Sequence, residues 1–182
     1  MRDVPFEING SPLTLRLTAG ALFDLYDRFG VRGSVLQASG AAEDTEEGRL
    51  ARAALAALLA EQGELWRRRQ GHAPREIPPA GAFLAERPDT LLATLRQAMT
   101  AGFARAVPSV EDDGEVNLVL AARNDEAADS AERLQVVFLT VCAARLHLAP
   151  ADALLLTPGE YLDMVTLLGG KEADDGSQND YN

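Results

Sequence analysis

Apolar residues alternate with other residues in two short segments at the start of the chain, on either side of the pair Asn9-Gly10. The alternating residues are Val4, Phe6, Ile8, Leu13, Leu15 and Leu17. Period-two alternation places these side chains on one face of a pleated sheet, and Asn-Gly accepts the positive φ angles of a tight turn. The pattern predicts a β-hairpin. Because a lone hairpin is only marginally stable in water, we expect its apolar face to be covered by an element close in sequence.

A helical period follows directly, with Thr18 as the predicted N-cap and Gly30 as the predicted end. Apolar residues recur at i, i+3, i+4 and i+7 between these two positions. We expect this helix to cover the hairpin, so that residues 1–30 form a hairpin-helix unit. The predicted core of the unit is Phe6, Ile8, Leu15, Leu22, Tyr26 and Phe29.

The middle region, residues 31–124, is predicted to be helical and to form an upstream module together with residues 1–30. Asp44 and Glu47 have the spacing of a capping box ahead of a long alanine- and leucine-rich segment. This segment predicts a helix that reaches about Arg69.

A proline-containing loop is predicted at 71–81, before a second long helix that begins near Pro88 and continues through Phe103. The acidic run at 111–115 is interrupted by Gly114 and predicts a solvated loop. Its spacing differs from that of a calcium-binding loop.

Residues 125–170 are predicted to form a helical downstream module. One helix is expected over 125–147, a short helical turn over 151–155, and a last helix from Thr157 to Leu168. Thr157 as the cap, Pro158 at the first helical position and Glu160 at the third have the spacing of a capping box at the start of this last helix. The pair Gly169-Gly170 is expected to stop this helix. The polar residues 171–182 are expected to be a disordered acidic tail.

Composition supports a helical fold, because about a third of the 182 residues are alanine or leucine, which are strong helix formers. The expected fold class is mainly α: an N-terminal β-hairpin packed on a helix, a helical bundle, and a C-terminal helix-turn-helix-like module.

Charge and cysteine content narrow the function. The net charge of −11 argues against a nucleic-acid partner, whose affinity would depend on neutralising phosphates. Cys142 is the single cysteine, no signal peptide is recognisable, and no apolar stretch approaches the length of a membrane span. We therefore expect a cytoplasmic protein with no membrane contact.

Candidate chemistry is sparse. His72 and His147 lack the spacing of metal ligands, and Cys142 lies on the apolar stripe of a predicted helix. Neither a phosphate-binding glycine loop nor a nucleophile elbow occurs. The sequence thus predicts no catalytic residues, no metal and no cofactor.

Arg67, Arg68 and Arg69 form a basic patch beside Trp66. Cations in a last helical turn complement the helix dipole, which is the plain structural explanation. A contact to an acidic protein partner is the alternative.

Two stretches of the chain resemble tail assembly chaperones of long-tailed bacteriophages and gene transfer agents. The first runs from Phe6-Glu7-Ile8-Asn9-Gly10 through Leu13 to Gly30. The second runs from Leu146-His147-Leu148-Ala149-Pro150 to Leu156-Thr157-Pro158-Gly159-Glu160-Tyr161. The first stretch resembles the opening of that family, and the second resembles its downstream module.

The resemblance implies a non-enzymatic assembly factor, present in the cytoplasm of an infected or prophage-carrying bacterium. Such a protein coats the tape measure protein, keeps it soluble and brings tail tube protein to it. The residues that we expect at partner contacts are Leu58, Leu65, Trp66, Leu154, Leu156, Tyr161 and Val165. We also expect a homo-oligomer, because thin alanine-rich helix faces bury little within one small chain.

Two alternatives remain open at this stage. One is a structural tail or adaptor protein that is retained in the finished particle. The other is a small helical enzyme or regulator.

Overall fold

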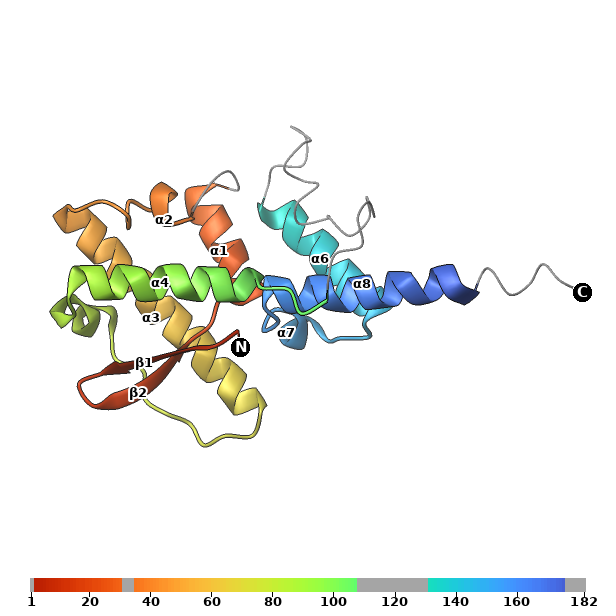
Figure 1. The fold of residues 1–182 in the computed structure, drawn as a ribbon, viewed down its shortest axis with the longest axis horizontal. Coiled ribbons are helices and arrows are strands. Elements are labelled where there is room, and N and C mark those ends of the chain that lie inside the picture. The colour runs from red at the N-terminus through yellow and green to blue at the C-terminus, as the bar shows by residue number, and fades with distance from the viewer. Residues whose placement is uncertain (1, 31–34, 108–130, 176–182) are drawn as a thin grey trace, which may run out of the picture.

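The computed structural model describes residues 2–30, 35–107 and 131–175, and it shows a mainly helical protein with an N-terminal antiparallel hairpin (Figure 1). In chain order the elements are β1 (Val4–Ile8), β2 (Ser11–Leu15), α1 (Ala19–Phe29), α2 (Val35–Ala38), α3 (Glu46–Arg69), the 3-10 helix η1 (Ala80–Ala85), α4 (Pro88–Phe103), α6 (Ala131–Arg145), α7 (Pro150–Ala153) and α8 (Pro158–Asp175). The expected fold class is confirmed. The predicted acidic loop at 111–115 lies outside the described residues.

The hairpin has the turn and the register that its sequence predicts. Asn9 and Gly10 both have positive φ, at 50° and 77°, as a two-residue hairpin turn of this kind requires. Val4 pairs with Leu15, and Phe6 pairs with Leu13, so the alternating apolar side chains share one face.

This face packs on α3 and α4, whereas the sequence analysis expected the neighbouring helix α1 to cover it. The reason is that α3 presents small residues to the strand. A Cβ built on Gly63 would lie 1.9 Å from the carbonyl oxygen of Thr14, so only glycine allows this approach. The backbone N–H of Arg16 also donates to the carbonyl of Leu59 at 3.1 Å.

Helix α1 has its predicted caps but not its predicted core. The Thr18 hydroxyl accepts from the Ala21 N–H, and Gly30 ends the helix with φ at 84°. Phe29 is 38% exposed, which corrects the expectation that it is buried. Its position on the last residue of α1 leaves it beyond the helices that pack on the first turns. Phe23 is the buried aromatic residue of this helix instead.

The other expected core residues of the hairpin-helix unit lie at or near the core. Ile8, Leu15 and Leu22 are buried, while Phe6 and Tyr26 are half-buried. Phe6 stacks on Phe83 of η1, an element that the sequence analysis did not predict, with ring centroids 6.2 Å apart.

Helix α3 begins one residue later than its sequence predicted. Thr45, and not Asp44, is the N-cap, because its hydroxyl accepts from the Gly48 N–H at 3.0 Å. The end at Arg69 is as expected, and Gly71 follows with φ at 83°.

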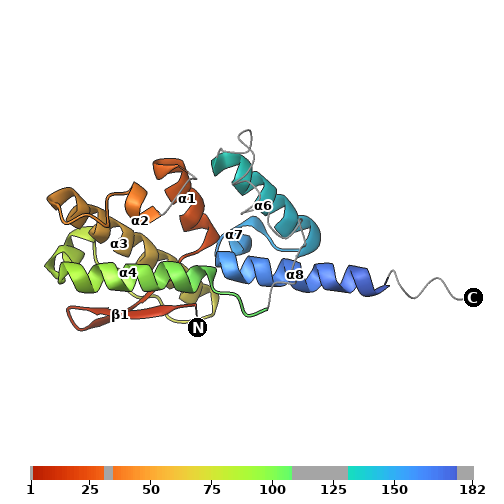
Figure 2. The same ribbon diagram turned by 45° about the horizontal axis from the view of Figure 1, so that its top comes forward.

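The downstream helices α6, α7 and α8 pack around a second core cluster. Its buried members are Ala19, Phe23, Leu134, Phe138, Cys142, Ala153, Leu156, Tyr161, Leu162 and Val165. Two of these residues, Ala19 and Phe23, belong to α1, which is an upstream element. The downstream helices are therefore built onto α1 (Figure 2).

Helix α8 continues to Asp175, which corrects two expectations at the C-terminus. Gly169-Gly170 does not stop the helix, and the first part of the expected tail, up to Asp175, is helical. Glycine lowers helix stability by only about 1 kcal/mol, so two of them do not oblige a helix to end. Residues 176–182 lie outside the described part of the chain.

Candidate functional site

The charged residue Arg16 lies where the upstream and downstream parts of the molecule meet. It follows β2 directly, and only 2% of its side chain is exposed. Its guanidinium donates to Asp3 Oδ1 at 2.6 Å and to Glu160 Oε2 at 2.5 Å. It also lies over the ring of Trp66, 4.0 Å from the centroid. We call these four residues the Arg16 joint.

The Arg16 joint satisfies a buried cation with two carboxylates and an aromatic face. A buried guanidinium is tolerated only when it is paired and hydrogen-bonded, and loss of one partner of a buried pair costs about 3 to 5 kcal/mol. The joint therefore fixes the start of α8 against the end of β2.

Glu160 has a second role at the start of α8. Its Oε2 accepts from the Thr157 N–H at 2.8 Å, and the Thr157 hydroxyl accepts from the Glu160 N–H at 3.2 Å. This is the capping box that the sequence predicted. One carboxylate thus both starts the helix and pairs with Arg16.

Asp163, one turn further along α8, is the centre of a second ionic cluster. Its carboxylate pairs with Arg2 and with Arg105, the latter at 2.8 Å, and it accepts from the N–H groups of Ala106 and Val107. Burial would raise the pKa of Asp163, but the hydrogen bonds from Arg105, Ala106, Val107 and Arg2 outweigh it and hold the pKa below its ordinary value. The segment that follows α4 is tied to α8 in this way.

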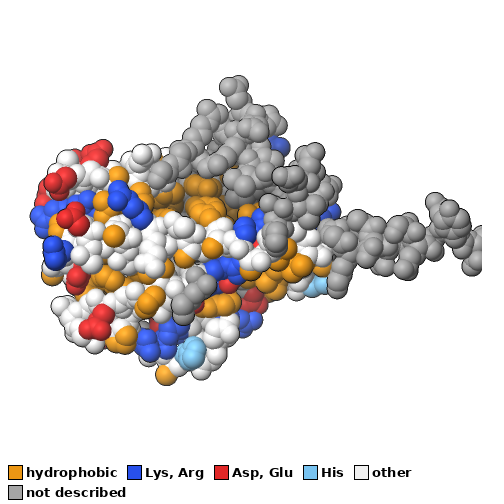
Figure 3. Space-filling model, in the orientation of Figure 1, with side chains coloured by type: hydrophobic (Ala, Val, Ile, Leu, Met, Phe, Trp, Pro, Cys, Tyr) orange, Lys and Arg blue, Asp and Glu red, His pale blue; other side chains and the backbone are white. Residues whose placement is uncertain are grey.

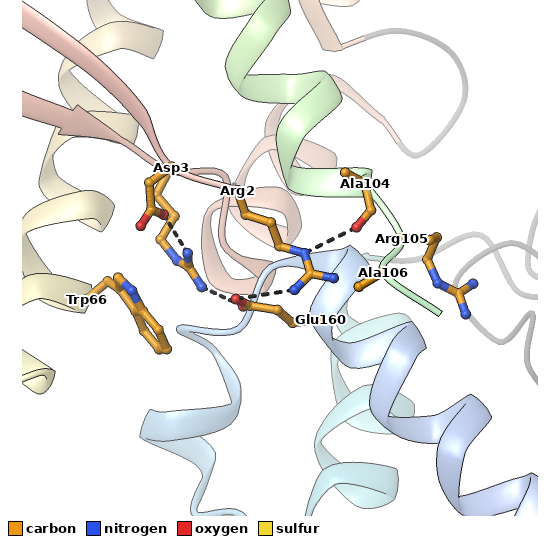
Figure 4. A pocket seen from close by; sticks show the side chains of 8 residues that line it. Arg2, Asp3, Trp66, Ala104, Arg105, Ala106 and Glu160 are labelled. Carbon is orange, nitrogen blue, oxygen red and sulfur yellow. Dashed lines mark hydrogen bonds and ion pairs between the residues drawn. The ribbon is translucent and has the colours of Figure 1, made fainter. Parts of the chain in front are cut away.

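A pocket of about 360 Å³ lies between the two ionic clusters. Its lining residues are Arg2, Asp3, Arg16, Trp66, Ala104, Arg105, Ala106 and Glu160. Figure 4 shows Glu160 near the centre, with Trp66 on one side and Arg105 on the other. The lining supplies guanidinium and carboxylate groups that are paired with one another, which is the chemistry of a structural joint.

Close backbone packing completes this joint. The N–H groups of Ala19 and Gly20, at the start of α1, donate to the carbonyls of Leu156 and Leu154 at 2.7 and 2.9 Å. A Cβ built on Gly159 would lie 2.1 Å from the carbonyl oxygen of Ala104. The link between α7 and α8 is therefore bonded to the start of α1, and the start of α8 packs on the residue that follows α4.

The residues expected at partner contacts do not form one surface. Leu156, Tyr161 and Val165 are buried in the second core cluster, so as they stand they are not accessible to a partner. They are buried because the apolar face of α8, and the residue Leu156 just before it, pack against side chains of α6 and α1. Leu58, Trp66 and Leu154 are half-buried, and Leu65 is 45% exposed.

The basic patch at the end of α3 is neutralised within the chain. Glu64, which is 4% exposed, accepts from Arg67 at 2.7 Å and from Arg68 at 2.9 Å, while Arg69 pairs with Asp152 at 2.6 Å. Burial would raise the pKa of Glu64, but hydrogen bonds from the Arg75 N–H and from the two arginines lower it below its ordinary value. These ion pairs within the chain give the patch a structural role that the sequence did not predict.

Among the described residues, His72, His147 and Cys142 are not part of any group that could hold a metal ion. Both His72 and His147 are exposed, and His147 has φ at 54° just after the end of α6. Burial raises the pKa of the Cys142 thiol to about 11, so the thiolate is scarce at neutral pH. Among the described residues no group of acidic, histidine or cysteine side chains could hold a metal ion, and no helix is long and apolar enough to cross a bilayer.

Sequence reasoning missed Arg16, Asp163 and Phe23. Arg16 lies between two apolar residues, and Asp163 lies within the apolar stretch of α8. A charged residue inside an apolar run is a usable signal for a buried ion pair, although it does not identify the partner. Phe23 was missed because α1 packs on two sides, and the sequence showed only one stripe.

Comparison of the chain with protein-family models, with curated proteins and with solved structures finds no match.

Proposed function

We propose that this protein is a tail assembly chaperone of a long-tailed bacteriophage or gene transfer agent. In this role it coats the tape measure protein, keeps it soluble and brings tail tube subunits to it. The resemblance of the two stretches 6–30 and 146–161 to that family is the basis of the proposal.

The observation that carries the proposal is the contact between these two stretches. They are more than a hundred residues apart in sequence, yet Arg16 pairs with Glu160, and the start of α1 is hydrogen-bonded to the backbone of 154–156. If the resemblance were accidental in both stretches, nothing would require them to form one joint. Their contact supports the proposal that the two stretches act as one unit.

The surface of the molecule is compatible with binding an apolar partner. Several large apolar side chains are well exposed: Phe29, Leu50, Leu65, Phe103, Val136, Met164 and Leu167. Figure 3 shows apolar atoms spread between charged groups on one face. A tape measure protein exposes extended apolar surface, so many weak contacts of this kind would keep it in solution while the acidic charge prevents aggregation.

The proposal is tested by co-expression with the tape measure protein of the same phage or gene transfer agent. We expect the tape measure protein to change from insoluble to soluble, and the complex to survive half-molar salt, because apolar burial is not screened by ions. Val136→Glu and Leu167→Glu, at side chains that are each 58% exposed, should reduce the soluble fraction. Thr90→Glu is the matched control, because it adds the same charge at an exposed polar position.

A tape measure protein that stays insoluble in the presence of the wild-type chain would overturn the chaperone proposal. Detection of the chain in purified mature particles would favour the structural adaptor instead.

A further inference from the structure

The outer face of α3 has an apolar stripe that nothing in the described part of the chain covers. Leu50 and Leu65 are 50% and 45% exposed, Ala54 is exposed, and Leu58 between them is half-buried. These positions recur at intervals of three and four along a helix of 24 residues, so they share one face. The opposite face, which includes Leu55, Leu59 and Gly63, is buried against the rest of the molecule.

The charges of α3 are arranged in a way that fits a second copy of the same helix. Its first turn carries Glu46 and Glu47, of which Glu46 pairs with Arg49, and its last turn carries Arg67, Arg68 and Arg69. Arg67 and Arg68 share the single carboxylate of Glu64, and Arg69 pairs with Asp152, so the last turn keeps a net positive charge, and the Arg68 side chain is 48% exposed. An antiparallel copy places each acidic end beside a basic end, and the helix dipoles also oppose favourably. A parallel copy would place like charges side by side at both ends.

We propose that α3 is the interface of a symmetric antiparallel dimer of this chain, with its two-fold axis near Leu58. About that axis Leu50 lies at the level of Leu65 of the second copy, and Glu47 lies at the level of Arg68. Each contact occurs twice, as a two-fold interface requires. Leu58 meets its own copy at the axis, and Ala54 lies opposite Glu61.

Glu61 sets the strength of this dimer. It is an exposed carboxylate within the apolar stripe, at the level of the small Ala54 of the second copy. A charged residue at such a position weakens a helix pair while it limits alternative registers. The dimer therefore forms reversibly, with a dissociation constant that depends on residue 61.

Sedimentation equilibrium over about 1 to 200 micromolar protein tests the proposal. The wild-type chain should associate to a dimer, and either Leu50→Glu or Leu65→Glu should raise the dissociation constant at least thirtyfold, which corresponds to about 2 kcal/mol. Both positions are exposed, so circular dichroism should show an unchanged fold. Glu61→Leu should tighten the dimer about tenfold. Thr90→Glu, at an exposed polar position on α4, is the control and should leave the dimer unchanged.

Disulfide cross-linking of the full chain tests the orientation. Leu50 and Leu65 are 15 residues apart, about 22 Å along the helix axis, so an antiparallel pair brings them together only between different copies. A mixture of Leu50→Cys and Leu65→Cys should cross-link rapidly, while each variant alone should not. The buried Cys142 thiol, with its pKa near 11, stays out of the reaction. Three results would overturn the proposal: a strict monomer at 200 micromolar, a dissociation constant that neither Leu→Glu variant changes, or rapid cross-linking of Leu50→Cys with itself.

Discussion

The upstream and downstream parts of this protein are stabilised in different ways. The first core cluster is built from aliphatic and small residues of β1, β2, α1, α2, α3 and α4, together with Phe83 of η1, and among the described residues none beyond α4 belongs to it. The second cluster is built around three aromatic rings, Phe23, Phe138 and Tyr161, whose centroids are 5.3 and 4.7 Å apart in successive pairs. One of these rings, Phe23, comes from the upstream helix α1.

The difference shows that the two parts depend on one another unequally. The described core of the upstream part consists of upstream residues. The core of the downstream part includes Ala19 and Phe23 of α1, and Glu160 at the start of α8 pairs with Arg16. Regions with fewer contacts of their own open at lower free energy. We expect the downstream helices to be the less stable part.

The largest expected effect is in the aromatic core. Phe138→Ala should lower the free energy of unfolding by about 3 to 5 kcal/mol, because Phe138 is 2% exposed and contacts both other rings. Phe29→Ala should cost about 1 kcal/mol or less, since that ring is 38% exposed. Urea unfolding of both variants checks this, and equal losses would contradict the assignment of the core.

The Arg16 joint should give the next largest effect. Glu160→Gln keeps the capping hydrogen bonds, because glutamine also serves at this position, but it removes the charge that pairs with the buried Arg16. We expect a loss of about 3 kcal/mol in urea unfolding. The control Glu76→Gln, at an exposed position between α3 and η1, should stay within about 0.5 kcal/mol of the wild type.

The upstream and downstream parts should differ less in how their free energy of unfolding depends on pH than in the effects above. The folded-state pKa values of Glu64 and Asp163 are both lowered, so each carboxylate stabilises the fold above its ordinary pKa. That stability is lost as the pH falls from about 5 through the folded pKa. Each of Glu64→Gln and Asp163→Asn should flatten the dependence of unfolding free energy on pH. An unchanged slope in either variant would show that its carboxylate is not stabilised in the fold.

The smallest effect concerns the start of α3. Thr45→Ala should cost about 1 kcal/mol, because it removes the cap on the Gly48 N–H, while Asp44→Ala should cost a few tenths of that. Thermal unfolding of the two variants compares them directly. A larger loss of stability from Asp44→Ala than from Thr45→Ala would show that Asp44 is the N-cap, as the sequence predicted.

The sequence predicted local structure better than it predicted packing. The Asn9-Gly10 turn, the Thr18 cap and the Thr157 capping box each depend on a few neighbouring residues, and all three are present. Which helix covers the hairpin depends on the close approach that Gly63 allows, and that is a contact between distant segments. Local patterns do not contain this information.

The candidate site was the least predictable feature. Glu160 was recognised only as a capping residue, and its pairing with Arg16 joins residues 144 positions apart. Leu156, Tyr161 and Val165 were expected on a surface because an apolar stripe does not show whether it faces a partner or the chain itself. The exposed stripe of α3 and the buried stripe of α8 look alike in sequence.

The unequal dependence of the two parts is tested most directly by separating them. Residues 1–107 and residues 131–182 are expressed apart, and each is unfolded in urea while circular dichroism is followed. We expect a cooperative transition for 1–107, no cooperative transition for 131–182 alone, and a gain of helix when the two are mixed. A cooperative transition of 131–182 on its own would contradict it.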